Sequence, residues 1–403
     1  MSLTEPALLV ALAFVTLAVF GWNVVAWPRS AGPGIAAILV RVVRQLAVVV
    51  LAVLTVGVSL NDQYDWYANW ADVTTIWSGA APDGTMLAAG AAAGAAAGVA
   101  LAPPAGSSSG TGTQSPAGAG TPAGLDLSST PGPNGQYHAY TVGGPASGYT
   151  GGVTVWVPPA YTDPAQSHRR FPVLEAFHGI PGNPTQWMNV LHLGDTVTTE
   201  VAAGRIADPV IVLPNFDPRS VDTECVNGDG RQPRMESWLA TDVPNWVTSH
   251  LRVETDRASW ATLGFSAGAY CATMVAMLHP DRFSAAISLG GYYQPTFDHS
   301  YVPFAPDSPQ ASRYDLVRLA RTNPPPVALW LQTSAADPIS YSNTEEFLRA
   351  ARPPLSITAD VLQNGGHRVQ VWAPLVPLTL SWLGSSIPGF RPPVDLAVRG
   401  GHG

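Results

Sequence analysis

Ser266 lies in the one stretch of this chain whose residue types and spacing point most directly to chemistry. The pentapeptide at 264–268 reads Gly-Phe-Ser-Ala-Gly, the G-x-S-x-G pattern of a nucleophile elbow. Such a turn passes sharply from strand to helix, and side chains at the two glycine positions would collide with neighbouring backbone. The apolar run 259–265 before it is typical of a buried parallel strand, and the Ala-, Met- and Leu-rich run 267–278 of a buried helix. This context favours a nucleophilic Ser266 over an incidental serine in a glycine-rich turn.

An acid and a base follow Ser266 in the order that this kind of site requires. Asp337 comes after a predicted strand at 327–332, and His367 comes after a predicted strand at 355–362. We expect His367 to take the proton of Ser266 and return it to the leaving group, while Asp337 orients the imidazole and stabilises its cation. Alternatively, Asp337 caps the predicted helix at 343–351, and the acid is Glu345 or Glu346.

A nucleophilic serine also needs two backbone N–H groups aimed at the negative charge that develops on the carbonyl oxygen. We expect one from Ala267, directly after the nucleophile, and the other from Ile180, in the loop after the predicted strand at 171–177. We expect His178, Trp187 and Tyr292 to contribute to substrate binding, although His178 has a second reading as a residue that only shapes the loop.

The elements that must position these residues alternate between strands and helices. Predicted strands include 137–142, 152–157, 171–177, 209–213, 259–265, 283–289, 327–332 and 355–362. Predicted helices include 183–204, 235–251, 267–278, 313–321, 343–351 and 371–383. Alternation of this kind implies a mostly parallel sheet covered on both faces. Together with the elbow, it predicts the α/β class and an α/β-hydrolase fold.

The N-terminal part of the chain predicts a membrane anchor. Residues 7–27 are apolar and uncharged, and a second apolar run covers 35–60; each is long enough to cross a bilayer. A cleaved signal peptide is disfavoured because no basic region precedes the first run. Arg29, Arg41 and Arg44 lie in or near the connection, so the positive-inside rule predicts a transmembrane helical hairpin with a cytoplasmic loop and both ends outside.

We predict five regions along the chain. Residues 1–62 form the membrane anchor, and 63–102 combine an aromatic segment at the membrane interface with an Ala/Gly-rich stalk. Residues 103–133, rich in Pro, Gly, Ser and Thr, form a disordered linker. Residues 134–390 form the catalytic domain, and 391–403 a C-terminal tail. An alternative is that 86–102 crosses the membrane as a third span, which would place the catalytic domain in the cytoplasm.

The net charge and the cysteine content argue against two further functions, nucleic-acid binding and metal-cluster binding. The net charge of −8 offers no basic footprint for nucleic acid. Cys225 and Cys271 are the only two cysteines, too few for a metal cluster. Cys225 lies in a polar loop at 215–233, which we expect to pass over the start of the helix that contains Cys271. An oxidising compartment would permit a disulfide between them; two unrelated thiols are the alternative.

The region from about residue 172 to 383 resembles the putative-esterase family, which includes the esterase D type and the mycolyltransferases of mycobacterial envelopes. The matching pieces are Phe-His-Gly at 177–179, Trp187, Met-Glu-Ser-Trp-Leu at 235–239, the elbow at 264–268, Asn-Gly-Gly-His at 364–367, and Trp372. The resemblance implies Ser266 as nucleophile, His367 as base, and Ile180 and Ala267 as oxyanion donors. The mycolyltransferases carry a Glu as the acid and an Asp where this chain has His178, so the chain departs from them at both positions.

The expectation is therefore a multi-pass membrane protein whose extracytoplasmic domain is a serine esterase or acyltransferase for carboxylic esters, working through an acyl-enzyme. Its partners would be the bilayer and a small-molecule or lipid ester, with no nucleic acid, and the chemistry requires no metal or organic cofactor. Two alternatives stay open. One is mycolyltransferase-like transfer of acyl chains to envelope sugars; the other is a catalytically silent protein that binds the envelope.

Overall fold

The computed structural model describes residues 6–30, 32–64, 84–89, 134–218, 221–230, 232–297 and 301–393. Within these residues the chain builds one nine-stranded sheet in the order β1-β9-β8-β7-β6-β4-β5-β3-β2. The strands are β1 (Gly84–Ala89), β2 (Gln136–Gly144), β3 (Tyr149–Val157), β4 (Val173–Phe177), β5 (Val210–Pro214), β6 (Trp260–Phe265), β7 (Ala285–Leu289), β8 (Ala328–Ser334) and β9 (Ser356–Leu362).

Strands β4 to β9 run parallel to their neighbours within that set. Their sequences are nearly continuous apolar runs; in β4, β5, β6 and β7 every residue is buried, as expected for a parallel sheet covered on both faces. Antiparallel strands lie at both edges: β2 and β3 on one side and β1 on the other. The predicted α/β-hydrolase-like sheet is thus confirmed.

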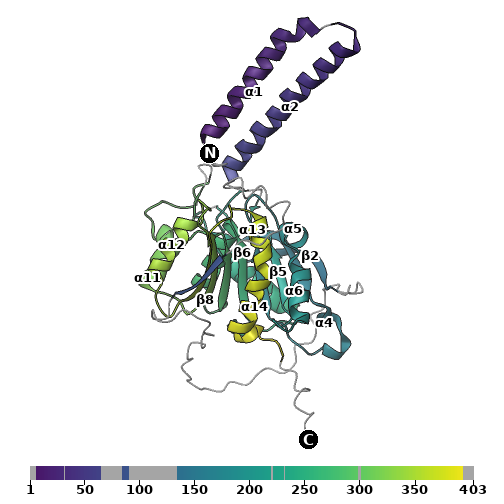
Figure 1. Ribbon diagram of the computed structural model, residues 1–403. Helices are drawn as coiled ribbons and strands as arrows, with labels where there is room; N and C mark the ends of the chain where they lie inside the picture. The colour runs from purple at the N-terminus through teal and green to yellow at the C-terminus, as the bar shows by residue number, and fades with distance from the viewer. Residues whose placement is uncertain are drawn as a thin grey trace, which may run out of the picture.

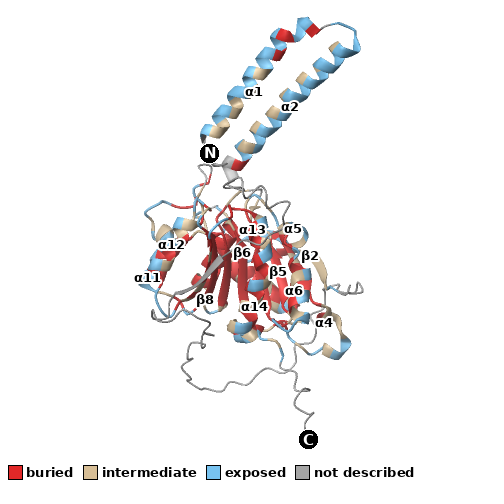
Figure 2. Cartoon of the chain, in the orientation of Figure 1, coloured by how far each residue is buried: buried red, intermediate tan, exposed pale blue. Residues whose placement is uncertain are grey.

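Helices cover both faces of the sheet (Figure 1). The core on one face includes residues of α8 (Val243–His250), α9 (Ala267–Leu278), α11 (Leu316–Thr322) and α12 (Tyr341–Ala350). The core on the other face includes residues of α6 (Leu193–Ala202), α13 (Val369–Trp372) and α14 (Val376–Ser386). Figure 2 shows the central strands as the most deeply buried part of the molecule.

Shorter helices lie in the connections. They are α4 (Pro159–Thr162), η2 (Pro164–Gln166), α5 (Thr185–Asn189), α7 (Met235–Ser237), η4 (Trp238–Asp242), η5 (Arg257–Ser259), α10 (Pro309–Tyr314), η6 (Ala373–Leu375) and η7 (Pro388–Phe390). Several helices predicted as continuous are divided, including those predicted at 313–321, which spans α10 and α11, and at 371–383, which contains η6. The helix predicted at 183–204 splits into α5 and α6, with His192 in left-handed backbone between them. The one predicted at 235–251 contains the π-helical turn η4.

Strand β1 differs from the prediction that residues 63–102 form only an interfacial segment and a stalk. Residues 84–89 pair antiparallel with β9, from Gly84 opposite Leu362 to Ala89 opposite Ile357. An edge strand leaves a row of backbone N–H and C=O groups unpaired, and an extended segment of any composition can satisfy them. Residues 86–89 therefore belong to the sheet and not to a third span. The rest of 65–102 and the predicted linker at 103–133 lie outside the described residues.

The N-terminal helices α1 (Pro6–Ala26) and α2 (Ile35–Tyr64) form a hairpin closed by η1 (Trp27–Ser30) (Figure 1). They meet at a hydrogen bond of 2.8 Å between the Thr16 and Thr55 hydroxyl groups. Both are long and apolar enough to cross a bilayer, a test that a signal sequence also passes.

Candidate active site

Ser266 occupies a strained turn between β6 and α9. Its φ of 56° and ψ of −126° lie in a region that non-glycine residues rarely adopt. The flanking glycines allow this turn. A Cβ at Gly264 would stand 1.9 Å from the carbonyl oxygen of Gly268, and a Cβ at Gly268 would stand 2.3 Å from that of Phe177. The helix must therefore begin directly against β4 and β6, which leaves Ser266 at the carboxyl edge of the sheet.

His367 and Asp337 converge on Ser266 from the ends of two other strands. The Ser266 hydroxyl donates to Nε2 of His367 at 2.8 Å, and Nδ1 of His367 donates to Oδ2 of Asp337 at 3.0 Å. Both partners are buried, with 5% of His367 and 2% of Asp337 exposed. The structure thus brings the three predicted side chains together in the order serine, histidine, aspartate. In such an arrangement the imidazole can accept the hydroxyl proton as the oxygen attacks a carbonyl carbon.

Asp337 is fixed by its own turn. Its Oδ1 accepts from the backbone N–H groups of Ile339 at 2.9 Å and Ser340 at 3.1 Å, and its Oδ2 accepts from the Ser340 hydroxyl at 2.6 Å. Burial raises the pKa of Asp337, but attraction to His367 and hydrogen bonds from His367 and Ser340 outweigh burial and lower this pKa below its ordinary value. The carboxylate is therefore ionised at neutral pH and rigidly aimed at the imidazole.

The alternative acids are not brought to the imidazole. Glu345 and Glu346 lie on α12 with exposed side chains, whereas the imidazole of His367 is buried against Asp337. Among the described residues, Asp337 is the carboxylate that contacts His367.

The two predicted oxyanion donors flank the serine. Ala267 is the first residue of α9, and Ile180 stands in the loop after β4. Gly179 lets that loop approach, because a Cβ there would stand 2.6 Å from the ring of Phe265. Ile180 and Ser266 line a common hollow of about 140 Å³, completed by Gly179, Pro181, Gln186, Phe265, His367, Arg368, Val369 and Trp372.

The residues predicted to bind substrate lie elsewhere, and this part of the prediction is corrected. Trp187 is fully buried and packs edge-on against Phe265 with ring centroids 5.1 Å apart. Tyr292 stacks on Tyr270 and donates its hydroxyl to Glu224 at 2.6 Å. Neither lines the hollow at Ser266. Both are large aromatic residues beside a functional motif, and their apolar surface is used in packing.

His178 lies where it shapes the loop after β4. It is fully buried, its ring stacks on Phe216 with centroids 4.1 Å apart, and its Nδ1 donates to the carbonyl of Gly179 at 2.9 Å. Burial lowers the pKa of His178 to about 4, so the ring is neutral at pH 7. It supports the loop that contains Ile180.

Cys225 and Cys271 are joined by a disulfide in the structure, with Cα atoms 5.6 Å apart. Cys271 lies in α9, five residues after Ser266, and Cys225 in the loop after β5. The bridge therefore ties this loop to the helix that begins at the serine. Glu224 and Cys225 both have left-handed backbone, with φ of 48° and 56°, so the loop makes a sharp turn at the bridge.

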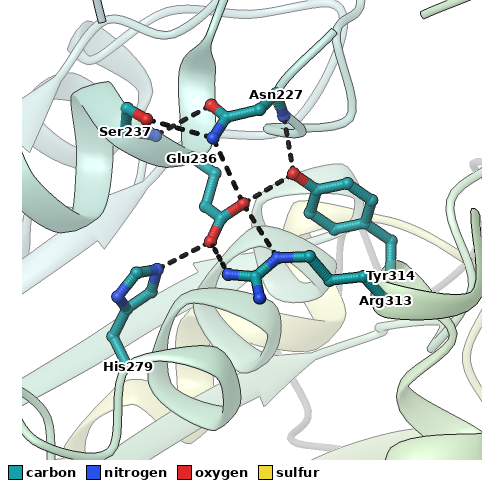
Figure 3. A network of polar contacts seen from close by, with 6 residues as sticks. All are labelled: Asn227, Glu236, Ser237, His279, Arg313 and Tyr314. Carbon is teal, nitrogen blue, oxygen red and sulfur yellow. Dashed lines mark hydrogen bonds and ion pairs between the residues drawn. The ribbon is translucent and has the colours of Figure 1, made fainter. Parts of the chain in front are cut away.

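A network of hydrogen bonds and ion pairs around the buried Glu236 also holds the loop after β5 (Figure 3). Glu236 accepts from Nε2 of His279 at 2.8 Å, from the Tyr314 hydroxyl at 2.6 Å, and from the guanidinium of Arg313. Asn227 accepts from the Ser237 backbone N–H and donates to the Ser237 hydroxyl, each at 3.0 Å. The network connects the loop after β5, α7, the end of α9 and α10.

The residues that surround and support the candidate triad are not among those predicted from the sequence. Ser340 has a recognisable signal, because an aspartate that accepts from the backbone two and three residues later makes a common local turn. Gln186 and Arg368 have none, since nothing in the sequence shows that their side chains border the hollow.

Residues 147–370, more than half of the chain, match the family described as Esterase, putative esterase. An uncharacterized protein of Corynebacterium glutamicum is 28% identical over 142 residues, which are 35% of this chain and 32% of that protein. The MPT51 antigen of Mycobacterium leprae is 31% identical over 86 residues, 21% of this chain and 27% of that protein. The matches thus span about a third or less of these relatives' own length.

Two solved structures share the fold. An S-formylglutathione hydrolase from Agrobacterium tumefaciens superposes with a TM-score of 0.53 and 16% identity, over 64% of this chain and 97% of that one. FphF, a fluorophosphonate-binding serine hydrolase of Staphylococcus aureus, superposes with a TM-score of 0.51 and 16% identity, over 62% and 99%. With a strand-turn-helix elbow in a mostly parallel sheet and a family match across it, the chain belongs to the putative-esterase family of α/β-hydrolases.

Proposed function

We propose that this esterase-family chain is a serine esterase or acyltransferase for carboxylic esters, anchored in the membrane with its catalytic domain outside the cytoplasm. The observation that carries the proposal is the hydrogen-bonded order of Ser266, His367 and Asp337 at the elbow. An intact set of this kind argues against a silent binding protein, because such a protein has no need of a strained serine aligned with a buried imidazole.

The reaction follows from this geometry. The Ser266 oxygen attacks the ester carbonyl, and its proton passes to Nε2 of His367, while Asp337 stabilises the imidazolium. The negative charge on the carbonyl oxygen is held by the backbone N–H groups of Ile180 and Ala267, helped by the positive end of α9. The bond to the leaving alcohol then breaks, and His367 gives its proton to that oxygen.

An acyl-enzyme remains on Ser266. Water, or the hydroxyl group of another molecule, attacks this ester in a second step with His367 as base. Hydrolysis and transfer share all steps up to this point and differ only in the acceptor. An acyltransferase for envelope sugars is therefore the second form of the same proposal.

The anchor is proposed from α1 and α2. Arg29, Arg41 and Arg44 lie at the loop end of the hairpin, where Arg44 donates to the carbonyl of Ala26 and to the hydroxyl of Ser30. Positive charge at this end favours a cytoplasmic loop. The chain after α2 would then continue on the opposite side of the membrane.

The proposal is tested with the full chain in detergent and 4-nitrophenyl acetate as substrate. We expect turnover that is lost in Ser266→Ala and kept in Ser385→Ala, which removes an exposed serine hydroxyl of α14. Added alcohols should divert part of the acyl group to new esters if transfer operates. Absence of turnover in the wild type across short, aromatic and long-chain esters would favour the silent binding protein.

A further inference from the structure

Ser340 stands at the amino end of α12, yet its hydroxyl group does not cap that helix. Serine is preferred at such a position because its oxygen can accept a hydrogen bond from a backbone N–H of the first turn, which stabilises a protein by about 1 kcal/mol. In α12 the side chain forms no such bond. It donates instead to Oδ2 of Asp337 at 2.6 Å. The usual structural reason for a serine at this position is therefore missing, and its hydrogen bond goes to the acid of the candidate triad.

A second hydroxyl group supports the first. Oγ1 of Thr333, on β8, lies 2.8 Å from Oγ of Ser340. An ionised carboxylate can only accept hydrogen bonds, so the Ser340 proton points to Asp337 and the Ser340 oxygen accepts from Thr333. All three side chains are buried, with at most 2% exposed, so bulk water does not compete for these bonds. A chain of donors thus runs from the sheet to the acid.

Ser340 and the base use the same oxygen of the acid. Oδ2 of Asp337 accepts from Ser340 and also from Nδ1 of His367 at 3.0 Å, whereas Oδ1 accepts from backbone N–H groups of its own turn. Hydrogen bonds to a carboxylate stabilise its negative charge. A carboxylate with this additional donor therefore attracts the imidazolium form of the base less strongly than a carboxylate without it.

We propose that Ser340, supported by Thr333, is a positioning residue that acts through Asp337 and sets the pH range in which His367 can serve as the base. Its hydroxyl group holds Oδ2 toward the imidazole, and it limits how strongly the carboxylate retains the imidazolium proton. The inference rests on the proposed esterase function and adds two side chains to the three that carry this function.

The other groups that face His367 stay in place when the Ser340 hydroxyl is removed. Nε2 of the ring faces the hydroxyl of the nucleophile at 2.8 Å, the ring packs edge-on against Trp372 with centroids 4.9 Å apart, and Arg368 is the next residue in the chain. Asp337 is the carboxylate in contact with the ring among the described residues. A change in pH dependence would therefore be transmitted through Asp337.

The test measures kcat/KM for 4-nitrophenyl acetate as a function of pH, with the full chain in detergent. Ser340→Ala removes the donor, Thr333→Val removes the supporting hydroxyl at nearly constant shape, and Thr333→Ser keeps that hydroxyl. The matched control is Thr344→Val. Thr344 is also a buried residue of α12, and its hydroxyl has no hydrogen-bond partner among the described residues.

In the wild type, kcat/KM should rise with pH on the acid side as the base loses its proton. We expect Ser340→Ala to move the midpoint of this rise to higher pH by about half a unit, because the carboxylate without its donor retains the imidazolium proton more strongly. Above the midpoint, kcat should fall by no more than about tenfold, since the backbone donors on Oδ1 remain.

Thr333→Val should move the midpoint in the same direction by a smaller amount, and Thr333→Ser should restore most of the wild-type midpoint. Thr344→Val should keep the wild-type midpoint. An unchanged midpoint in Ser340→Ala, or a shift to lower pH, overturns the proposal. A loss of turnover that is equal at every pH does so as well, because it means that Ser340 only supports the turn. If Ser340→Ala does not fold, an unchanged midpoint in Thr333→Val overturns the proposal in its place.

The rate of labelling by a fluorophosphonate, measured over the same pH range, gives the midpoint without any ester substrate. If the wild type is labelled and none of these variants moves the midpoint, the role of Ser340 is wrong and the proposed function stands. If the folded wild type shows neither labelling nor turnover, the proposed function fails, and the inference fails with it.

Discussion

At the scale of single residues, the acid is the most informative position of the candidate site. Two readings of the sequence competed, Asp337 and the pair Glu345 and Glu346. The carboxylate of Asp337 accepts three hydrogen bonds from its own turn, in addition to the one from the imidazole. A side chain held in this way loses little further conformational freedom when it orients the histidine, whereas an exposed glutamate on α12 would lose more.

We therefore predict that Asp337→Asn lowers kcat by about 10⁴-fold, because the amide favours the wrong tautomer of His367. Glu345→Gln and Glu346→Gln should stay within about twofold of the wild type, since both side chains are exposed. Steady-state kinetics on 4-nitrophenyl acetate measures all three. Near-normal turnover in Asp337→Asn, with a large loss in either glutamate variant, would show that the acid is misassigned.

The residues of the candidate triad could be predicted from sequence because each follows a recognisable strand, and parallel strands present their carboxyl ends at one edge. The substrate contacts could not. Trp187 and Tyr292 are aromatic residues near motifs, but the sequence does not show which face of an element they occupy. For the same reason the sequence does not show that Arg368, a charged residue in a loop, lines the hollow at Ser266.

At the scale of elements, the loop after β5 is held by a disulfide and by the Glu236 network. Burial raises the pKa of Glu236, but hydrogen bonds from His279, Arg313 and Tyr314, together with attraction to Arg313, outweigh burial and lower this pKa from 4.5 to about 2. A carboxylate with a depressed folded-state pKa contributes stability above its unfolded-state pKa and loses it as pH falls through the folded-state value.

Glu236→Gln should accordingly destabilise the full chain by about 1–3 kcal/mol at pH 7, the range for losing hydrogen bonds to a charged group. Its difference from the wild type should shrink between about pH 4.5 and pH 2 as Glu236 becomes protonated. Thermal unfolding followed by near-UV circular dichroism measures this, with Glu346→Gln as the exposed control. A difference that does not change with pH would contradict the role assigned to the network.

We expect the disulfide to make its own contribution to the free energy of unfolding. The bridge joins two cysteines with a sequence separation of 46, so replacing both with serine should destabilise the chain by roughly 3–4 kcal/mol on the chain-entropy description. The measurement is thermal unfolding of the double variant, next to alkylation of the wild type without reductant. Two thiols that react freely in the unreduced wild type would rule out the bridge.

The regular part of the fold was predictable because buried parallel strands and the elbow helix have strong local signals. The edge strand β1 was not, since residues 84–89 lie at the start of an Ala/Gly-rich stretch and contain one β-branched residue, Thr85. Its pairing depends on the open edge of β9, which is far away in the chain. The break between α5 and α6 likewise depends on the left-handed backbone at His192, which this residue type does not predict.

At the scale of the whole molecule, an apolar hairpin precedes a hydrolase domain, and the charge of the hairpin loop predicts on which side of the membrane that domain lies. Protease added to intact cells should cut within 103–133 and leave the catalytic domain as a shorter fragment on a denaturing gel, because the arginines at the hairpin loop favour a cytoplasmic loop. Immunoblotting with an antibody against the catalytic domain follows the shortening, and a cytoplasmic marker controls for lysis. Protection in intact cells, with cleavage only after permeabilisation, would reverse the topology.

The central claim, that Ser266 is an activated nucleophile, is tested most directly by reaction with a fluorophosphonate probe. The hydroxyl is hydrogen-bonded to His367 at 2.8 Å, and an activated serine forms a stable covalent adduct with this class of reagent, whereas an ordinary serine does not. We predict that the full chain is labelled, that peptide mapping places the adduct on Ser266, and that His367→Gln reduces the labelling rate by several orders of magnitude. A folded wild-type chain that resists the probe, or an adduct on another residue, would contradict the claim.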